Sequence, residues 1–283
     1  MTKTYSTLEK IASNLAKLKK EFFQNYTGTS HIQEIIPVSW SETFPIENSY
    51  FESLHKFAQN NPIYYNSFDQ DIFGINCTVY EGDVNKYWLN SIQHGASHAP
   101  FSPTWIFSAF VLSMMANKLG FHDVVDIGSG DGRIAYCAKI LECNSSSIEI
   151  DNSLVKLQNE IIKKTQIDFN PHCSDALMFD YSKLNLAKPS FFIGGLAQMG
   201  GNVLASGVLE KTNRQFSNSG FVFAGTVSPK YPSDPMSNAG WGTTIVQNNL
   251  KMLDCLVLPS MWTAKEKDDT HYIFTQIQNS NPN

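Results

Sequence analysis

Three glycines alternate with polar residues in the stretch DIGSGDGR, which runs from residue 126 to residue 133. The stretch follows a short run of β-branched residues and precedes a helical pattern, so the sequence predicts a turn between a strand and a helix. Glycines permit backbone angles that a Cβ forbids and let a ligand approach the main chain, while the helix start offers unpaired N–H groups to an anion. A dinucleotide-binding GxGxxG turn needs a third glycine where this chain has Arg133. The stretch therefore predicts a ligand-cradling turn and disfavours a nicotinamide cofactor.

A carboxylate, Glu149, ends the next predicted strand, 23 residues after Asp126. A βαβ unit brings the ends of adjacent parallel strands side by side, so this carboxylate can accept two hydrogen bonds from a ribose diol. An ordinary surface acid is the alternative explanation for Glu149 taken alone. Together with the glycine turn, Glu149 indicates a site for an adenosine-containing cofactor.

Three motifs together resemble those of class I S-adenosylmethionine-dependent methyltransferases. DIGSGDG (126–132) looks like the family's first motif, and SIEID (147–151) looks like its second strand with the ribose-binding acid. CSDA (173–176) is similar to the short motif that receives the adenine amino group. Their order and spacing fit the family, and the resemblance covers about residues 101–277. It implies a Rossmann-like fold, S-adenosylmethionine as cofactor and methyl transfer as the reaction.

The resemblance implies a role for each matching position. Asp126 would orient the turn and the cofactor's methionine ammonium, the glycines would make room for the cofactor, and Glu149 would hold the ribose hydroxyls. Asp175 would read the adenine N6, with Ile150 and Ala176 packed beside the ring. Two plainer alternatives stay open: Asp126 as a residue that only stabilises the turn, and Asp175 as an ordinary helix N-cap. The residues expected to bind the cofactor are Phe101, Thr104, Asp126, Gly128, Gly130, Asp131, Gly132, Glu149, Ile150, Asp175, Ala176 and Gly194.

A second, narrower resemblance concerns FSPT (101–104), which stands shortly before the glycine turn. This element followed by GSGDGRI is similar to a small group of protein lysine methyltransferases of archaea and mitochondria. In that group the upstream element lies against the methionine end of the cofactor, which makes Phe101, Pro103 and Thr104 candidates for closing the site. This chain departs from the group at Phe101, where Tyr is usual, and at Trp105, where Pro or a small residue is common.

The segment FFIGGLAQMGG (191–201) includes the predicted fourth strand, near which the methyl acceptor approaches in this fold. Enzymes that methylate amines of nucleic acids, and some that methylate proteins, carry an Asn or Asp-Pro-Pro-aromatic motif there. Because this chain lacks that motif, adenine and glutamine amide acceptors lose support. Gln198 is the only obvious polar side chain of the segment. No general base can be named, so the catalytic residues are left unknown.

A protein lysine is the favoured acceptor, with a small molecule close behind. Methyl transfer needs the acceptor held about 3–3.5 Å from the methyl carbon, so positioning supplies much of the acceleration. A lysine has to lose its proton before it attacks, and a partly desolvated pocket of aromatic rings or carbonyls favours that loss. A catalytically silent binding or scaffolding protein that kept the fold is the alternative from another class.

Two histidines, the DDTH stretch and Trp241 are weaker candidates for functional residues. His94 and His98 are four residues apart, but Gly95 lies between them and no third ligand stands at a matching spacing, so no metal site is expected. The stretch DDTH (268–271) is expected to form a solvated turn. Trp241 either lines a substrate loop or packs in the core, and both interpretations stay open.

Strands that alternate with helices after residue 103 predict an α/β fold. We expect a three-layer Rossmann-like methyltransferase domain (96–283) with a mostly parallel sheet and an antiparallel last strand, because no helix-length separator stands between the last two strands. Residues 1–95, with an amphipathic helix from Leu8 to about Tyr26 and many aromatic side chains, are expected to form an N-terminal helical cap. The expected strands are 121–127, 147–150, 168–172, 190–193, 220–226, 253–258 and 272–277, and the expected helices after residue 103 are 105–119, 133–142 and 153–164.

Composition limits the possible partners. The 283 residues hold 21 Lys and Arg against 26 Asp and Glu, and the net charge of −5 argues against nucleic acid as a partner. Five cysteines without a CxxC pair indicate reduced thiols, and the first residues lack a secretory signal pattern, so a cytoplasmic location is expected. The longest uncharged apolar run, 105–116, is shorter than the roughly 20 residues a membrane span needs. The expected partner is a protein or small-molecule methyl acceptor, and the oligomeric state is left unknown.

Overall fold

The computed structural model describes residues 2–89, 101–197, 200–225, 240–259 and 270–278. Its main sheet has seven strands in the order β6-β5-β4-β7-β8-β10-β9. Strands β4 to β8 run parallel, and β10 runs antiparallel to both of its neighbours. The predicted α/β class, the mostly parallel sheet and the antiparallel last strand are thus confirmed. The strands are β4 (Asp123–Ile127), β5 (Asn144–Glu149), β6 (Pro171–Cys173), β7 (Pro189–Ile193), β8 (Gly220–Ala224), β9 (Leu250–Leu258) and β10 (Thr270–Ile277).

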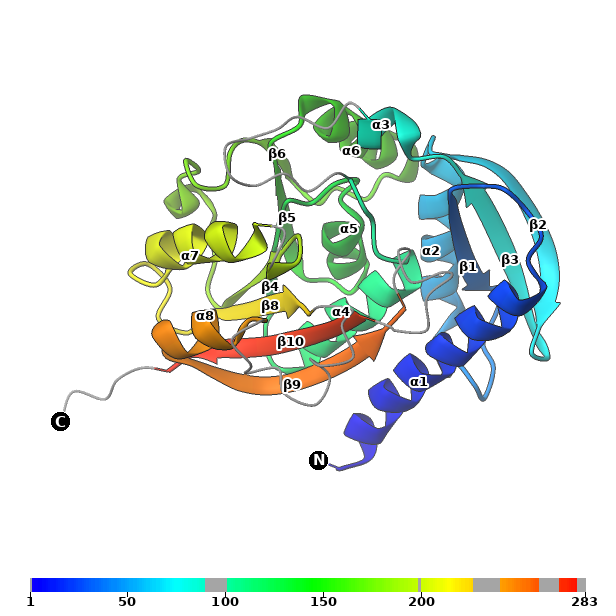
Figure 1. Cartoon of the computed structure of the whole chain (residues 1–283), viewed down its shortest axis with the longest axis horizontal. Helices are drawn as coiled ribbons and strands as arrows, with labels where there is room; N and C mark the ends of the chain where they lie inside the picture. Colours follow the sequence, from blue (N-terminus) through cyan, green and yellow to red (C-terminus); the bar gives the residue numbers. More distant parts are fainter. Residues whose placement is uncertain (1, 90–100, 198–199, 226–239, 260–269, 279–283) are drawn as a thin grey trace.

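Helices cover both faces of this sheet and give the expected three layers (Figure 1). Successive residues of a strand point to opposite faces, so Val124 packs with α4, α5 and α6 while Val125 packs with α7 and α8. Phe192 and Phe191 of β7 divide in the same way. The helices of this part are α4 (Ile106–Lys118), α5 (Arg133–Ile140), α6 (Asn152–Thr165), the short 3₁₀ helix η1 (Tyr181–Lys183), α7 (Gly201–Thr212) and α8 (Gly242–Gln247).

The N-terminal module, residues 2–89, is not the helical cap that the sequence predicts. It contains a three-stranded antiparallel sheet in the order β1-β3-β2, with helices around it. Strands β2 and β3 are joined by the two-residue loop Phe73 and Gly74, whose φ values of 59° and 75° are those of a tight hairpin turn. The elements are α1 (Thr2–Asn25), β1 (Ile32–Pro37), α2 (Asn48–Asn60), β2 (Tyr64–Ile72), β3 (Ile75–Gly82) and α3 (Asn85–Leu89).

The module shares one core with the rest of the chain. Phe51 of α2 packs edge to face on Phe107 of α4, with ring centroids 5.7 Å apart, and Phe57 packs on Tyr136 of α5 at 4.8 Å. Helix α1 lies against β9 and α4, so α4 is buried between the module and the sheet (Figure 1). The predicted boundary between residues 95 and 96 lies outside the described residues. Among the described residues, a continuous apolar core joins the N-terminal module to the part of the chain that contains the main sheet.

Within the described ranges, no helix is both long enough and apolar enough to cross a membrane. In the same ranges, no group of three or more His, Cys, Asp and Glu side chains is arranged to hold a metal ion. His94, His98 and the two carboxylates of the DDTH stretch lie outside the described residues.

Two glycines with nearly equal backbone angles allow a matched stability test. Gly132 (φ 77°) and Gly74 (φ 75°) are both left-handed, but an added Cβ would lie 2.5 Å from the buried Phe169 ring at Gly132 and would touch nothing within 4 Å at Gly74. We expect Gly74→Ala to lower the free energy of unfolding by about 1 kcal/mol, the backbone cost alone. Gly132→Ala should cost roughly 1–3 kcal/mol more because of overpacking. Urea denaturation measures both, and equal losses would contradict the expected role of the Phe169 contact.

Candidate functional site

The glycine turn, residues 128–132, leaves the carboxyl end of β4 at the place where the strand order reverses. β4 pairs with β5 on one side and with β7 on the other, and in open α/β sheets ligands bind at such a switch point. Gly128 and Gly130 have φ values of 68° and 58°, in the left-handed region that favours glycine. The turn therefore stands where the sequence predicts it, between a strand (β4) and a helix (α5), and it leaves the sheet between the ends of β5 and β7.

Glu149 binds the glycine turn directly. Its Oε2 accepts a hydrogen bond of 2.8 Å from the Gly130 N–H, and its Oε1 accepts from the N–H groups of Ile150 and Asp151 at 2.8 and 3.0 Å. A carboxylate has about four acceptor positions, so the main chain uses three of them. Glu149 can then take about one further hydrogen bond, where the sequence analysis expects two from a ribose diol. Burial raises the pKa of Glu149, and these N–H donors oppose the rise.

Asp126 lies beneath the turn with one oxygen free. The residue is 3% exposed, and its Oδ2 is buried with no hydrogen-bond partner among the described residues. Burial and the neighbouring carboxylates Glu149 and Asp131 raise the pKa of Asp126 to about 8. An unpartnered buried oxygen of this kind suits a cationic group, which would satisfy the oxygen and stabilise its ionised form.

Gly194 brings the end of β7 close to the turn. Its N–H donates to the Ile127 carbonyl at 2.8 Å, and a Cβ at this position would lie 2.7 Å from that oxygen and 2.9 Å from the Gly128 carbonyl oxygen. At Gly128, by contrast, an added Cβ would meet only the Gly194 Cα, at 3.8 Å. The two glycines therefore let two strand ends approach each other and leave space beside the main chain.

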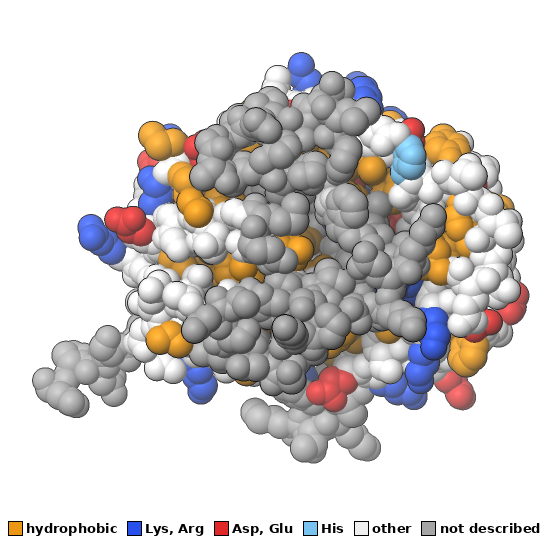
Figure 2. All heavy atoms as spheres, in the orientation of Figure 1, with side chains coloured by type: hydrophobic (Ala, Val, Ile, Leu, Met, Phe, Trp, Pro, Cys, Tyr) orange, Lys and Arg blue, Asp and Glu red, His pale blue; other side chains and the backbone are white. Residues whose placement is uncertain are grey.

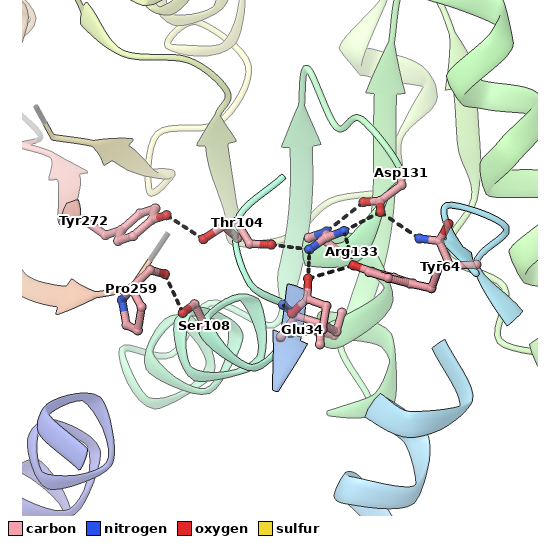
Figure 3. A network of polar contacts seen from close by, with 11 residues as sticks. Glu34, Tyr64, Thr104, Ser108, Asp131, Arg133, Pro259 and Tyr272 are labelled. Atoms are coloured by element: carbon pink, nitrogen blue, oxygen red, sulfur yellow. Dashed lines mark hydrogen bonds and ion pairs between the residues drawn. The ribbon is translucent and has the colours of Figure 1, made fainter. Parts of the chain in front are cut away.

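Phe101 packs on the glycine turn, and Thr104 points elsewhere. A Cβ added to Gly130 would lie 2.5 Å from the Phe101 ring, which is itself edge to face with Tyr87 at a centroid distance of 6.0 Å. The Thr104 hydroxyl instead forms a hydrogen bond of 2.8 Å with the Tyr272 hydroxyl of β10 (Figure 3). The segment 101–105 thus runs from the turn to the antiparallel strand, and closure of a bound ligand by Phe101 stays a prediction.

Asp131 and Gly132 support the turn from within the protein. The Asp131 Oδ1 and Oδ2 accept hydrogen bonds from Arg133 (Figure 3). Oδ2 also accepts one from the Asn61 amide at 2.9 Å. The carboxylate is fully buried, and a contact between Asp131 and a cofactor stays a prediction. Gly132 lies against the Phe169 ring and begins α5 in a left-handed conformation.

The third motif is joined to the second. The Ser174 N–H donates to the Glu149 carbonyl at 2.9 Å, so the end of β6 lies beside the end of β5. Asp175 is half-buried, and its Oδ1 accepts from the Leu177 N–H at 2.8 Å in a local turn where no helix begins. The N-cap alternative for Asp175 is therefore wrong. Adenine recognition by Asp175, Ile150 and Ala176 stays a prediction.

Gln158 is a site residue that the sequence analysis missed. Its amide nitrogen donates to the Ser129 hydroxyl at 2.9 Å and to the Gly130 carbonyl at 2.7 Å, while its amide oxygen accepts from the Ser147 hydroxyl at 2.7 Å. Gln158 lies on α6 and is fully buried. The available signal was an uncharged polar residue on the apolar stripe of that helix, four residues after Leu154.

Trp241 packs in the core. Its ring is stacked on Phe223 at a centroid distance of 4.6 Å, and its indole N–H donates to the Ala224 carbonyl. Of the two interpretations left open for Trp241, core packing is confirmed. Gln198 lies outside the described residues.

Comparisons with known proteins give likeness to solved structures only. No protein-family model and no curated protein matches the chain. Magnesium protoporphyrin IX methyltransferase from Synechocystis PCC 6803 with bound SAH matches with a TM-score of 0.45 and 7% identity, over 61% of this chain and 83% of that chain. The glycopeptide N-methyltransferase MtfA gives 0.44 and 10% over 58% and 94%, and TrmN from Thermus thermophilus gives 0.43 and 11% over 71% and 57%.

Asp126 should leave a signature in the pH dependence of stability. An unfolded Asp has a pKa of about 3.9, and the folded value is about 8, so between these values the native chain holds a proton that the unfolded chain has released. Stability therefore falls as pH rises, by up to about 1.4 kcal/mol per pH unit from this group. We expect Asp126→Asn to remove this slope in urea denaturation between about pH 5 and about pH 7. Asp168→Asn, at an exposed carboxylate, is the control, and a slope unchanged in Asp126→Asn would contradict the assignment.

Proposed function

We propose that this chain is an S-adenosylmethionine-dependent methyltransferase that holds its cofactor at the carboxyl edge of the seven-stranded sheet. The single observation that carries this proposal is the hydrogen bond from the Gly130 N–H to Glu149 Oε2, because it joins the first motif to the acid of the second at the switch point. The bond from the Ser174 N–H to the Glu149 carbonyl adds the third motif. Three segments that resemble one family in sequence thus meet at one edge.

The residues of this edge fit such a cofactor. The Oδ2 of Asp126, which has no partner among the described residues, suits a methionine ammonium, and the remaining acceptor position on Glu149 suits a ribose hydroxyl. Bound S-adenosylmethionine would supply an electrophilic methyl group on a positively charged sulfur. This chain would then bind and orient the cofactor and the acceptor, and Gly128 and Gly194 leave space for the cofactor beside the main chain.

We infer a protein lysine as the favoured acceptor, with a small molecule as the close alternative. The net charge of −5 argues against a nucleic acid backbone as partner. On the face shown in Figure 2, the described Lys and Arg side chains are scattered around the outline of the molecule. The segment after β7 carries Gly194 and Gly195 in place of an Asn or Asp-Pro-Pro-aromatic motif, which gives no support to adenine or glutamine acceptors.

One observation favours a catalytically silent binding protein with the same fold. The described residues 194–197 and 200–201, which follow β7, include no titratable side chain that could take a proton from an acceptor. Such a protein would bind the cofactor and transfer nothing, so binding and transfer have to be measured separately.

Cofactor binding is tested by calorimetry with S-adenosylhomocysteine. We expect the wild type to bind and Gly130→Val to bind at least about tenfold more weakly, a change of about 1.4 kcal/mol, because the added Cβ would lie 2.5 Å from the Phe101 ring. Gly74→Val makes the same substitution at a left-handed glycine in open surroundings and should keep the wild-type affinity. Absence of binding by the wild type, or strong binding unchanged in Gly130→Val, would refute the proposed pocket.

Methyl transfer and the acceptor are tested together with labelled S-adenosylmethionine in a native lysate. We expect labelled protein, abolished by Glu149→Ala, and mass spectrometry should find one added CH₂ group on a lysine side chain. Label only in small molecules would move the acceptor to the alternative class. No transfer by a wild type that binds the cofactor would favour the silent binding protein.

A further inference from the structure

The guanidinium of Arg133 joins the glycine turn to the N-terminal module (Figure 3). Its Nε donates to Asp131 Oδ1 at 2.9 Å and its Nη2 to Asp131 Oδ2 at 2.6 Å. On its other side, Nη1 donates to Glu34 Oε1 of β1 at 2.5 Å, and Nη2 donates to the Tyr64 hydroxyl of β2 at 3.3 Å. Nη1 also donates to the Thr104 carbonyl. A guanidinium has five N–H donors, so the four partners occupy all of them.

These charges are buried together. Arg133 is 2% exposed, and both Asp131 and Glu34 are 0% exposed. Burial raises the pKa of Glu34, and the neighbouring Arg133 charge opposes that rise. Removal of one partner from a buried ion pair leaves an uncompensated charge that water cannot reach. The three side chains therefore hold their places as a unit.

Glu34 restrains the glycine turn from two sides. Through Arg133 it fixes Asp131, which belongs to the turn itself. Its Oε2 also accepts a hydrogen bond of 2.8 Å from the N–H of Ile106, the first residue of α4, directly after the 101–105 segment. That segment carries Phe101, whose ring lies on Gly130. One carboxylate of the N-terminal module thus controls both the turn and the aromatic ring against it.

We propose that Glu34 is a positioning residue for cofactor binding and that the N-terminal module is a working part of the cofactor site. Glu34 does not touch the cofactor. It acts through Arg133 and the 101–105 segment, which hold Gly130 and Phe101 in the arrangement that the ligand requires. This role rests on the proposed function, because it presumes that the glycine turn receives S-adenosylmethionine.

The first experiment compares two carboxylates on neighbouring strands of the module. We expect Glu34→Gln, which keeps the shape and removes the charge, to weaken S-adenosylhomocysteine binding at least about tenfold in calorimetry. Glu81→Gln on β3 is the matched control, since Glu81 accepts hydrogen bonds from Tyr26 and Asn66 and takes no part in the Arg133 contacts. It should keep the wild-type affinity. Tyr64→Phe, which removes one hydroxyl from the Arg133 contacts, should weaken binding in the same direction and is available if Glu34→Gln does not fold.

A double-mutant cycle separates positioning from general destabilisation. The proposal connects Glu34 to Phe101 only through the 101–105 segment, and effects at independent sites add. If Glu34 acts through Phe101, the loss of affinity caused by Glu34→Gln should shrink to less than about threefold in a Phe101→Ala background. Hydrogen exchange of the cofactor-free protein should also rise in residues 101–107 of Glu34→Gln and stay unchanged there in Glu81→Gln.

The outcomes are distinct. A wild type that binds S-adenosylhomocysteine while Glu34→Gln and Tyr64→Phe bind equally well would overturn the role of Glu34 and leave the proposed function standing. Full additivity of Glu34→Gln and Phe101→Ala would overturn the route through the 101–105 segment. A wild type that does not bind at all would refute the proposed function itself, while the exchange comparison still reports on the positioning of the segment.

Discussion

A left-handed backbone at Gly128, Gly130 and Gly132 is the constraint around which the described structure is organised. Each flank of the turn has its own support: the Glu149 carboxylate at the Gly130 N–H, the Gln158 amide at the Gly130 carbonyl, and aromatic rings on the second and third glycines. These supports come from β5, α6 and the segments before α4 and β6. A turn held this rigidly loses little further entropy when a ligand arrives, which is the advantage of a preformed site.

The electrostatics of the site follow from the same packing. Asp126, Asp131 and Glu149 bring three carboxyl groups close to one turn, and the guanidinium of Arg133 is the buried cation that the described residues place beside them. Carboxyl groups therefore outnumber the buried cation at this site, and Asp126 reduces the negative charge by keeping a proton at neutral pH. A cationic ligand would relieve it in another way. This imbalance distinguishes the site from a phosphate-binding glycine loop, where positive charge is in excess.

The sequence predicted what local patterns encode. The strands and the three helices expected after residue 103, the turn and the place of Glu149 follow from periodicity, glycine spacing and βαβ geometry, and they are confirmed. Helices α7 and α8 were not predicted. The strands of the N-terminal module were missed because their hairpin turn is Phe73 and Gly74, with a bulky residue at positive φ instead of the usual Asn or Asp. The partners of Asp131 were missed for a different reason. Asn61 is 70 residues away from Asp131 in the sequence, and a short motif does not predict a contact between residues so far apart.

The position of α1 has a consequence for how the chain reaches this structure. The first described helix lies against β9, a strand near the other end of the printed sequence, and its apolar stripe is buried there. During synthesis that stripe is made more than 200 residues before its partner strand, so it stays without its final cover until β9 has left the ribosome. Closure of so long a loop is slow compared with local helix and hairpin formation. Early chaperone binding to this helix would therefore protect the nascent chain at its most exposed stage.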